Sequence, residues 1–132
     1  MIAILPLFAS LGVFLALVLE KVYPHPFIVE ELIKGGLVYV LLTSKDEHTN
    51  KGLNAILIGV MFGITESSLY GYMSILAQEP LLLLKRIVIT VSLHTVTTIT
   101  IFYFGKLHIK LTALGVISAI LMHYVYNLVS SY

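Results

Sequence analysis

Long apolar runs, separated by short polar stretches, dominate this sequence. A helix needs roughly 20 apolar residues to cross a hydrocarbon core of about 30 Å, and several of the runs approach that length. Inside a bilayer, helices satisfy their own backbone N–H and C=O groups where no water is present. The predicted spans are residues 2–19, 27–43, 53–77, 81–104 and 111–129. We therefore expect an all-α, polytopic membrane bundle of about five transmembrane helices.

Composition supports a membrane chain and excludes several other classes. Hydrophobic residues make up 58% of the sequence and charged residues 11%, whereas soluble domains are about one quarter charged. The connecting stretches are too short to fold alone, so residues 1–132 are predicted to form a single integral membrane domain embedded in the lipid bilayer. The net charge of +1 offers no surface for nucleic acid. The absence of cysteine excludes thiolate nucleophiles and cysteine-bound metals.

The orientation in the cell membrane is only weakly encoded. Five spans place the N-terminus and the second and fourth loops on one face of the membrane. Basic residues mark that face at Lys45, Lys51, Lys106 and Lys110, but the opposite face carries nearly as many. The positive-inside rule therefore gives a slight preference for a multi-pass protein with a cytoplasmic N-terminus.

Ionisable groups inside the spans carry the functional information. A charge at mid-bilayer costs about 2.5 to 3.5 kcal/mol on the insertion scale, so such groups are usually functional. The second to fifth spans each hold at least one polar group of this kind, and most of these groups fall in the same half of the membrane. They are Glu30, Glu31 and Lys34 in the second span, Glu66 in the third, Arg86 and His94 in the fourth, and His123 and Asn127 in the fifth. We expect the acids and histidines to share one water-accessible cavity.

The third span also carries a stripe of small residues at every fourth position: Gly59, Gly63, Ser67 and Gly71. Small residues at this spacing let two membrane helices approach closely. Glu66 lies one residue before Ser67 of the stripe and shares a helical face with Phe62, four residues earlier. The sequence therefore predicts that Glu66 lies near a tight helix contact.

Taken in order, these groups form four motifs on successive spans. The motifs are Glu30-Glu31-Leu32-Ile33-Lys34, Phe62-Gly63-Ile64-Thr65-Glu66, a lone His94, and His123-Tyr124-Val125-Tyr126-Asn127. The series resembles the PrsW family of intramembrane proteases, whose pattern is EExxK, FxxxE, a single His, and HxxxD or HxxxN. That family is distantly related to the CAAX-processing and bacteriocin-processing proteases. The chain departs from the pattern in its shortness and in Ser67, where Asn is common.

The resemblance implies a glutamate-dependent endopeptidase that cleaves a membrane-anchored protein or peptide, for example an anti-sigma factor in a site-1-type step. It places Glu30 and Glu66 on the attacking water and His123 and Asn127 at the oxyanion. Glu31 becomes a structural or proton-relay partner, although the sequence alone does not separate Glu30 from Glu31. His94 joins the catalytic set, and Lys34, Phe62 and Arg86 support it.

Two other interpretations compete. Glu66, His94 and His123 form a two-histidine, one-carboxylate set that suits zinc. The sequence lacks an HExxH motif and supplies three carboxylates, which favours metal-free glutamate catalysis without a cofactor. The same groups can also serve a small proton-coupled or ion-binding membrane protein, or an inactive protease-like binding protein. The arrangement of the groups separates these interpretations. In a proton relay they lie along a path, whereas in a protease they surround one cavity.

Overall fold

The computed structural model describes residues 4–20, 22–23, 25–76 and 80–130. Within these residues the chain forms five α-helices and one short 3-10 turn, which confirms the predicted all-α bundle. The helices are α1 (Leu5–Glu20), α2 (Pro26–Thr43), α3 (Lys51–Leu76), α4 (Pro80–Leu107) and α5 (Thr112–Ser130), with the 3-10 turn η2 (Ile109–Leu111) before α5. The predicted spans also included residues 2, 3 and 77, which lie outside the described residues.

Three stretches of the described chain are long and apolar enough to cross a membrane: Lys51–Leu69, Leu83–Leu107 and Ile109–Val129. Helix α1 adds a shorter apolar stretch, Leu5–Leu19. Large apolar side chains such as Leu11 and Leu121 point outward and are more than half exposed. Outward apolar side chains suit a bundle whose surroundings are lipid, because the bilayer and not the protein covers them.

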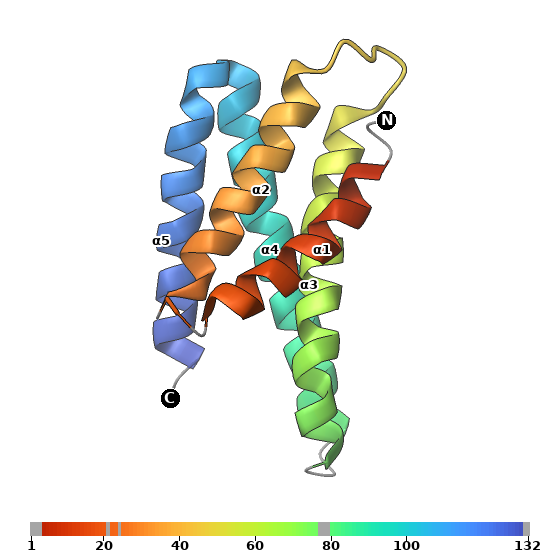
Figure 1. Cartoon of the computed structure of the whole chain (residues 1–132), viewed down its shortest axis with the longest axis vertical. Coiled ribbons are helices and arrows are strands. Elements are labelled where there is room, and N and C mark those ends of the chain that lie inside the picture. Colours follow the sequence, from red (N-terminus) through yellow and green to blue (C-terminus); the bar gives the residue numbers. More distant parts are fainter. Residues whose placement is uncertain (1–3, 21, 24, 77–79, 131–132) are drawn as a thin grey trace.

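Helix α2 occupies the centre of the bundle (Figure 1). It packs against α1, α3, α4 and α5, whereas α5 packs mainly against α4 and α2. Of the inward-facing residues of α2, three are charged: Glu30, Glu31 and Lys34 are all buried. The helix that packs against all four others therefore buries three charged side chains.

Close contact between α3 and α4 depends on the small residues predicted from the sequence. A Cβ atom on Gly59 would lie 2.6 Å from Cα of Thr95, and one on Gly63 would lie 2.5 Å from Cα of Val91. Real Cβ atoms do not approach backbone this closely, so both positions require glycine. This close approach brings the third and fourth helices together at the level of the ionisable groups.

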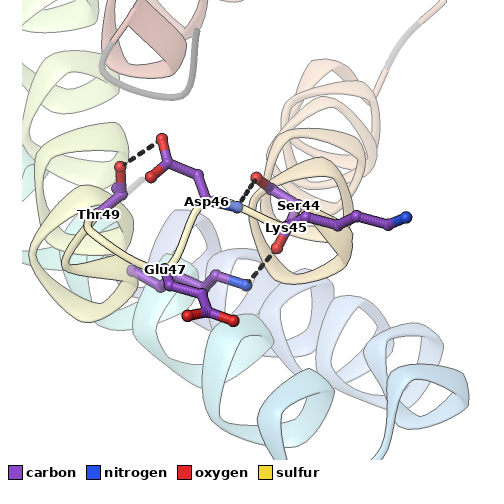
Figure 2. Close-up of a pocket in the computed structure, with 6 residues that line it drawn as sticks. Ser44, Lys45, Asp46, Glu47 and Thr49 are labelled. Carbon is purple, nitrogen blue, oxygen red and sulfur yellow. Dashed lines mark hydrogen bonds between the residues drawn. The ribbon is translucent and has the colours of Figure 1, made fainter.

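The helix ends are stabilised by local interactions. Helix α2 begins at Pro26, whose fixed φ suits the first turn of a helix. At the other end of α2, Nζ of Lys51 donates to the carbonyl oxygens of Leu42 and Ser44 at 3.0 and 2.7 Å. The Asn50 side chain accepts from N–H of Leu53 and caps the start of α3. Figure 2 shows the hollow of this α2–α3 loop, at the far end of α2 from Glu30 and Glu31.

Candidate active site

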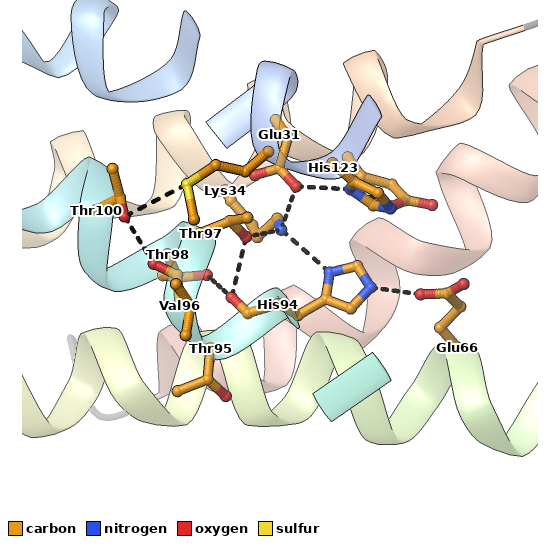
Figure 3. A network of polar contacts seen from close by, with 12 residues as sticks. Glu31, Lys34, Glu66, His94, Thr95, Val96, Thr97, Thr98, Thr100 and His123 are labelled. Carbon is orange, nitrogen blue, oxygen red and sulfur yellow. Dashed lines mark hydrogen bonds and ion pairs between the residues drawn. The ribbon is translucent and has the colours of Figure 1, made fainter. Parts of the chain in front are cut away.

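Lys34 lies at the centre of a buried polar network (Figure 3). Its side chain is fully buried on α2, and its Nζ donates to Oε1 of Glu31 at 2.6 Å and to Oγ1 of Thr97 at 2.8 Å. Nζ also lies 3.1 Å from Nδ1 of His94. An ammonium group has three N–H donors, so these three contacts satisfy it completely. The lysine links helix α2 to helix α4.

Glu31 joins this network to the fifth helix. Its Oε1, which accepts from Lys34, also lies 2.9 Å from Nδ1 of His123. The neighbouring Glu30 points to the same histidine, with Oε2 3.8 Å from Nδ1. Both adjacent acids of α2 therefore approach one imidazole of α5.

His94 and Glu66 form a second acid–imidazole pair, between α4 and α3. Nε2 of His94 contacts Oε2 of Glu66 directly. The glycines of α3 explain how the pair meets, because the missing side chain of Gly59 lets α3 pack on the backbone of His94. Glu66 follows about two turns later, and its side chain reaches back to the imidazole ring. The predicted position of Glu66 beside a tight helix contact is what the structure shows.

Aromatic rings hold the two imidazoles in place. The ring of Phe62 is fully buried and stacks on His94, with centroids 5.7 Å apart and planes at 24°. Nζ of Lys34 lies 5.3 Å from the centroid of the same Phe62 ring. The rings of His94 and His123 meet edge to face, 5.2 Å apart. Phe27, from the first turn of α2, packs against His123 at 5.8 Å. The two pairs thus form one cluster.

Exposure divides the acids into two kinds. The side chains of Glu31, Lys34 and His94 are sealed at 0% exposure, whereas Glu30 keeps 11% and Glu66 keeps 19%. A buried ion pair of this kind is held by its hydrogen bonds, since the low-dielectric interior penalises any unpaired charge. Glu30 and Glu66 are therefore more accessible from outside the bundle than Glu31. Exposure separates the two adjacent glutamates, which the sequence alone does not.

Asn127 and Arg86, the other two predicted site residues, lie on the same helices as His123 and His94. Asn127 is half-buried on α5, one turn beyond His123, as the HxxxN spacing predicts. Arg86 is exposed on α4, about two turns before His94. The cluster itself gathers Glu30, Glu31 and Lys34 from α2, Phe62 and Glu66 from α3, His94 from α4 and His123 from α5.

Three ligand atoms in the cluster are close enough to hold a metal ion. One atom each from Glu30, His94 and His123 lie within 4.8 Å of one another. Two imidazoles and a carboxylate form a donor set that zinc accepts, with room for water at a fourth position. The zinc set predicted from the sequence used Glu66, and the geometry places Glu30 there instead. Glu66 instead contacts Nε2 of His94.

The structure also reveals two features that the motifs do not show. Thr97 accepts from Lys34 and donates to the carbonyl oxygen of His94, so it belongs to the network. Its position three residues after His94, on the same face of the helix, is the sequence feature that could have identified it. In addition, Oε2 of Glu31 is buried and has no hydrogen-bond partner within the described chain. A buried carboxylate oxygen of this kind is an open acceptor for a proton donor.

Apolar helices around a buried cluster of carboxylates and imidazoles define a multi-pass membrane protein whose reactive groups lie inside the bundle. The family model for PrsW family intramembrane metalloproteases matches residues 25–132. The chain therefore belongs to the PrsW family of intramembrane proteases, as its four motifs predicted. No curated protein and no solved structure matches the chain significantly.

Proposed function

We propose that this chain hydrolyses a peptide bond of a membrane-anchored protein or peptide, with a water molecule activated by glutamate. One observation carries the proposal: three carboxylates and two imidazoles, drawn from four helices, meet in one cluster inside the bundle. Charged groups in membrane helices are costly and persist where they serve a function. Peptide hydrolysis needs a base, an oxyanion stabiliser and an acid, and this cluster holds groups for each role.

Glu66 and Glu30 are the proposed groups for the attacking water. Both keep an exposed edge, and His94 binds only Oε2 of Glu66, which leaves Oε1 to accept from water. In the proposed step, a carboxylate takes a proton as the water oxygen attacks the carbonyl carbon. The same proton then passes to the leaving nitrogen as the C–N bond breaks. Glu31 is sealed and already shared by Lys34 and His123, so it acts as a positioning group.

His123 and Asn127 are the proposed groups for the oxyanion. They lie one turn apart on α5, and His123 lies close to both Glu30 and the ring of His94. A hydrogen-bond donor that is already in place when the charge develops stabilises the tetrahedral intermediate without reorganisation. A side-chain amide fixed on a packed helix meets that condition, and His123 joins it once Nε2 carries a proton. The amide of Asn127 supplies such N–H groups.

A metal-dependent mechanism is the competing proposal, and the cluster of Glu30, His94 and His123 supports it. Glu31 beside Nδ1 of His123 is also the kind of carboxylate that orients a metal-binding histidine. A bound zinc ion would supply Lewis-acid polarisation of the scissile carbonyl. Against it, both ring nitrogens of His94 already have protein partners, Lys34 and Glu66. The identity of the three donors therefore supports a metal site, whereas the existing hydrogen bonds of His94 oppose one.

A proton relay is the second candidate function. Glu66, His94, Lys34, Glu31 and His123 form an unbroken series of contacts from α3 to α5. Such a series can pass protons without hydrolysing anything. The clustering favours a protease, because both acid–imidazole pairs face each other across ring centroids only 5.2 Å apart.

The position of the cluster suggests where a substrate is cut. At about 1.5 Å rise per residue, Glu31 lies about 8 Å from the start of α2 and His123 about 10 Å from the end of α5. Helices α3 and α4 extend further on the same side of the bundle (Figure 1). We propose cleavage just below one membrane surface, in a single-pass substrate such as an anti-sigma factor. If the N-terminus is cytoplasmic, that surface is the outer one.

Reconstitution separates these functions. The purified chain is placed in liposomes with a membrane-anchored, fluorogenic peptide substrate, and cleavage is compared between the wild type and Glu66→Gln. We expect the substitution to lower kcat at least about 100-fold, the range of a lost general base, with little change in thermal stability. Glu47→Gln, on the exposed α2–α3 loop, is the control. Proton flux without cleavage in the same liposomes supports the relay, and full cleavage by Glu66→Gln overturns the glutamate mechanism.

A further inference from the structure

Lys34 contacts both acid–imidazole pairs of the site, and its chemistry restricts where their protons lie. An ammonium group has no acceptor, so Nδ1 of His94, 3.1 Å from Nζ, must accept. A neutral imidazole that accepts at Nδ1 carries its hydrogen on Nε2. That hydrogen points at Glu66, whose carboxylate is the partner of Nε2.

Glu31 makes Nδ1 of the other imidazole, His123, a donor and not an acceptor. Its Oε1 accepts from Lys34 at 2.6 Å, and the ion pair keeps Glu31 an ionised, acceptor-only group. Nδ1 of His123, 2.9 Å from the same oxygen, must therefore donate. The hydrogen of a neutral His123 then lies on Nδ1, and its Nε2 has a lone pair.

We propose that Lys34 is a positioning residue that fixes the ring protons of His94 and His123 in opposite tautomers. Its catalytic consequence rests on the proposed peptidase function. His94 enters the reaction as a donor that occupies one oxygen of Glu66 and leaves the other for water. His123 enters as an acceptor at Nε2, and it donates to the oxyanion only after a proton has moved onto that nitrogen. Thr97, at 2.8 Å, completes the three acceptors that hold the lysine in place.

The same bonds make Lys34 and a metal ion alternatives. A metal bound to His94 needs a lone pair on a ring nitrogen, but Lys34 holds the lone pair of Nδ1 and Nε2 carries a hydrogen. A divalent ion among Glu30, His94 and His123 would also lie close to a buried positive charge. Like charges at short range in a poorly solvated interior repel strongly. Lys34 therefore opposes metal binding at this cluster.

The first test reads the tautomers directly. The full chain, with ¹⁵N-labelled histidine rings, is studied by NMR in lipid nanodiscs, and His94→Asn and His123→Asn assign the signals. We expect the Nε2–H form for His94 and the Nδ1–H form for His123. In Lys34→Met the signal of the unprotonated Nδ1 of His94 moves downfield, because it loses its donor, whereas Lys85→Met, on the exposed face of α4, changes nothing. An Nε2–H form of His123 in the wild type overturns the proposal, and this measurement needs no variant at position 34 that folds.

The second test measures zinc affinity by competition with a chelating dye. We expect Lys34→Met to bind zinc at least about tenfold more tightly than the wild type, since it removes a positive charge next to the ligands. His123→Asn added to Lys34→Met should abolish the gain. Equal affinity in the wild type and Lys34→Met overturns the proposed competition. If the chain shows the predicted tautomers but has no peptidase activity, the proposed role of Lys34 stands and only the proposed function is overturned.

Discussion

Oε1 of Glu31 lies 2.9 Å from Nδ1 of His123, and the same oxygen accepts from Lys34 at 2.6 Å. One buried oxygen thus joins helix α2 to helix α5 and balances the charge of the central lysine. Glu30, the residue before Glu31, has a partly exposed side chain. Substitutions of the two adjacent acids of the EExxK motif are therefore expected to have different effects on stability and activity.

Glu31→Gln should destabilise the protein. The substitution leaves the ammonium of Lys34 buried without its counter-charge, and breaking one partner of a buried ion pair costs about 3 to 5 kcal/mol. Glu30→Gln, at a partly exposed position, should unfold near the wild-type temperature but lose most of its cleavage activity. Thermal unfolding in detergent and cleavage in liposomes measure the two effects. Equal melting temperatures for both variants would contradict this division of roles.

Gly63→Ala should separate the third and fourth helices. The added Cβ would lie 2.5 Å from Cα of Val91, and because that atom belongs to the backbone it does not move aside easily. Overpacking of this kind costs about 1 to 3 kcal/mol, and it should also lower activity by pulling Glu66 away from His94.

Gly36→Ala is the matched control for that change, since nothing lies within 4 Å of its added Cβ. Alanine has the higher helix propensity by about 1 kcal/mol, so this variant should be as stable as the wild type or more so. If Gly63→Ala behaves like Gly36→Ala, the tight contact between α3 and α4 is not required.

Chelators distinguish the two proposed mechanisms. Under glutamate catalysis, prior treatment with EDTA or phenanthroline should leave the cleavage rate unchanged within a factor of about two, because no metal takes part. Loss of activity on chelation, followed by recovery on adding zinc, would establish the metal mechanism. A soluble peptide assayed with a known zinc protease under the same conditions controls for chelator strength.

Lys51→Met should lower stability without altering the chemistry. The lysine donates to two carbonyl oxygens at the end of α2, far from the site, and losing such hydrogen bonds costs about 1 kcal/mol. We expect a lower melting temperature with unchanged kcat. Lys45→Met, an exposed neighbour in the same loop, should show neither effect. A fall in kcat for Lys51→Met would instead link the α2–α3 loop to the site.

The sequence by itself determined the class of this protein and most of the residues of its buried polar cluster. Long apolar runs require helices in lipid, because backbone groups in a bilayer must bond within their own segment. Rare ionisable residues in such runs stand out against the cost of placing them there, so Glu66, His94 and His123 were identifiable from position alone. The glycine stripe of α3 likewise predicted the close helix contact, since small residues at every fourth position share one face.

Only the tertiary structure decided which groups are partners. Whether Glu30 or Glu31 binds His123, and whether Glu66 or Glu30 joins a metal-ligand set, depends on the rotation of α2 against α4 and α5. Sequence periodicity gives the faces of one helix, but not how those faces turn toward one another. Hydrogen bonds require atoms within about 3 Å, and a rotation of a few tens of degrees changes the partner. The central place of Lys34, bound to three side chains from two helices, follows from that packing.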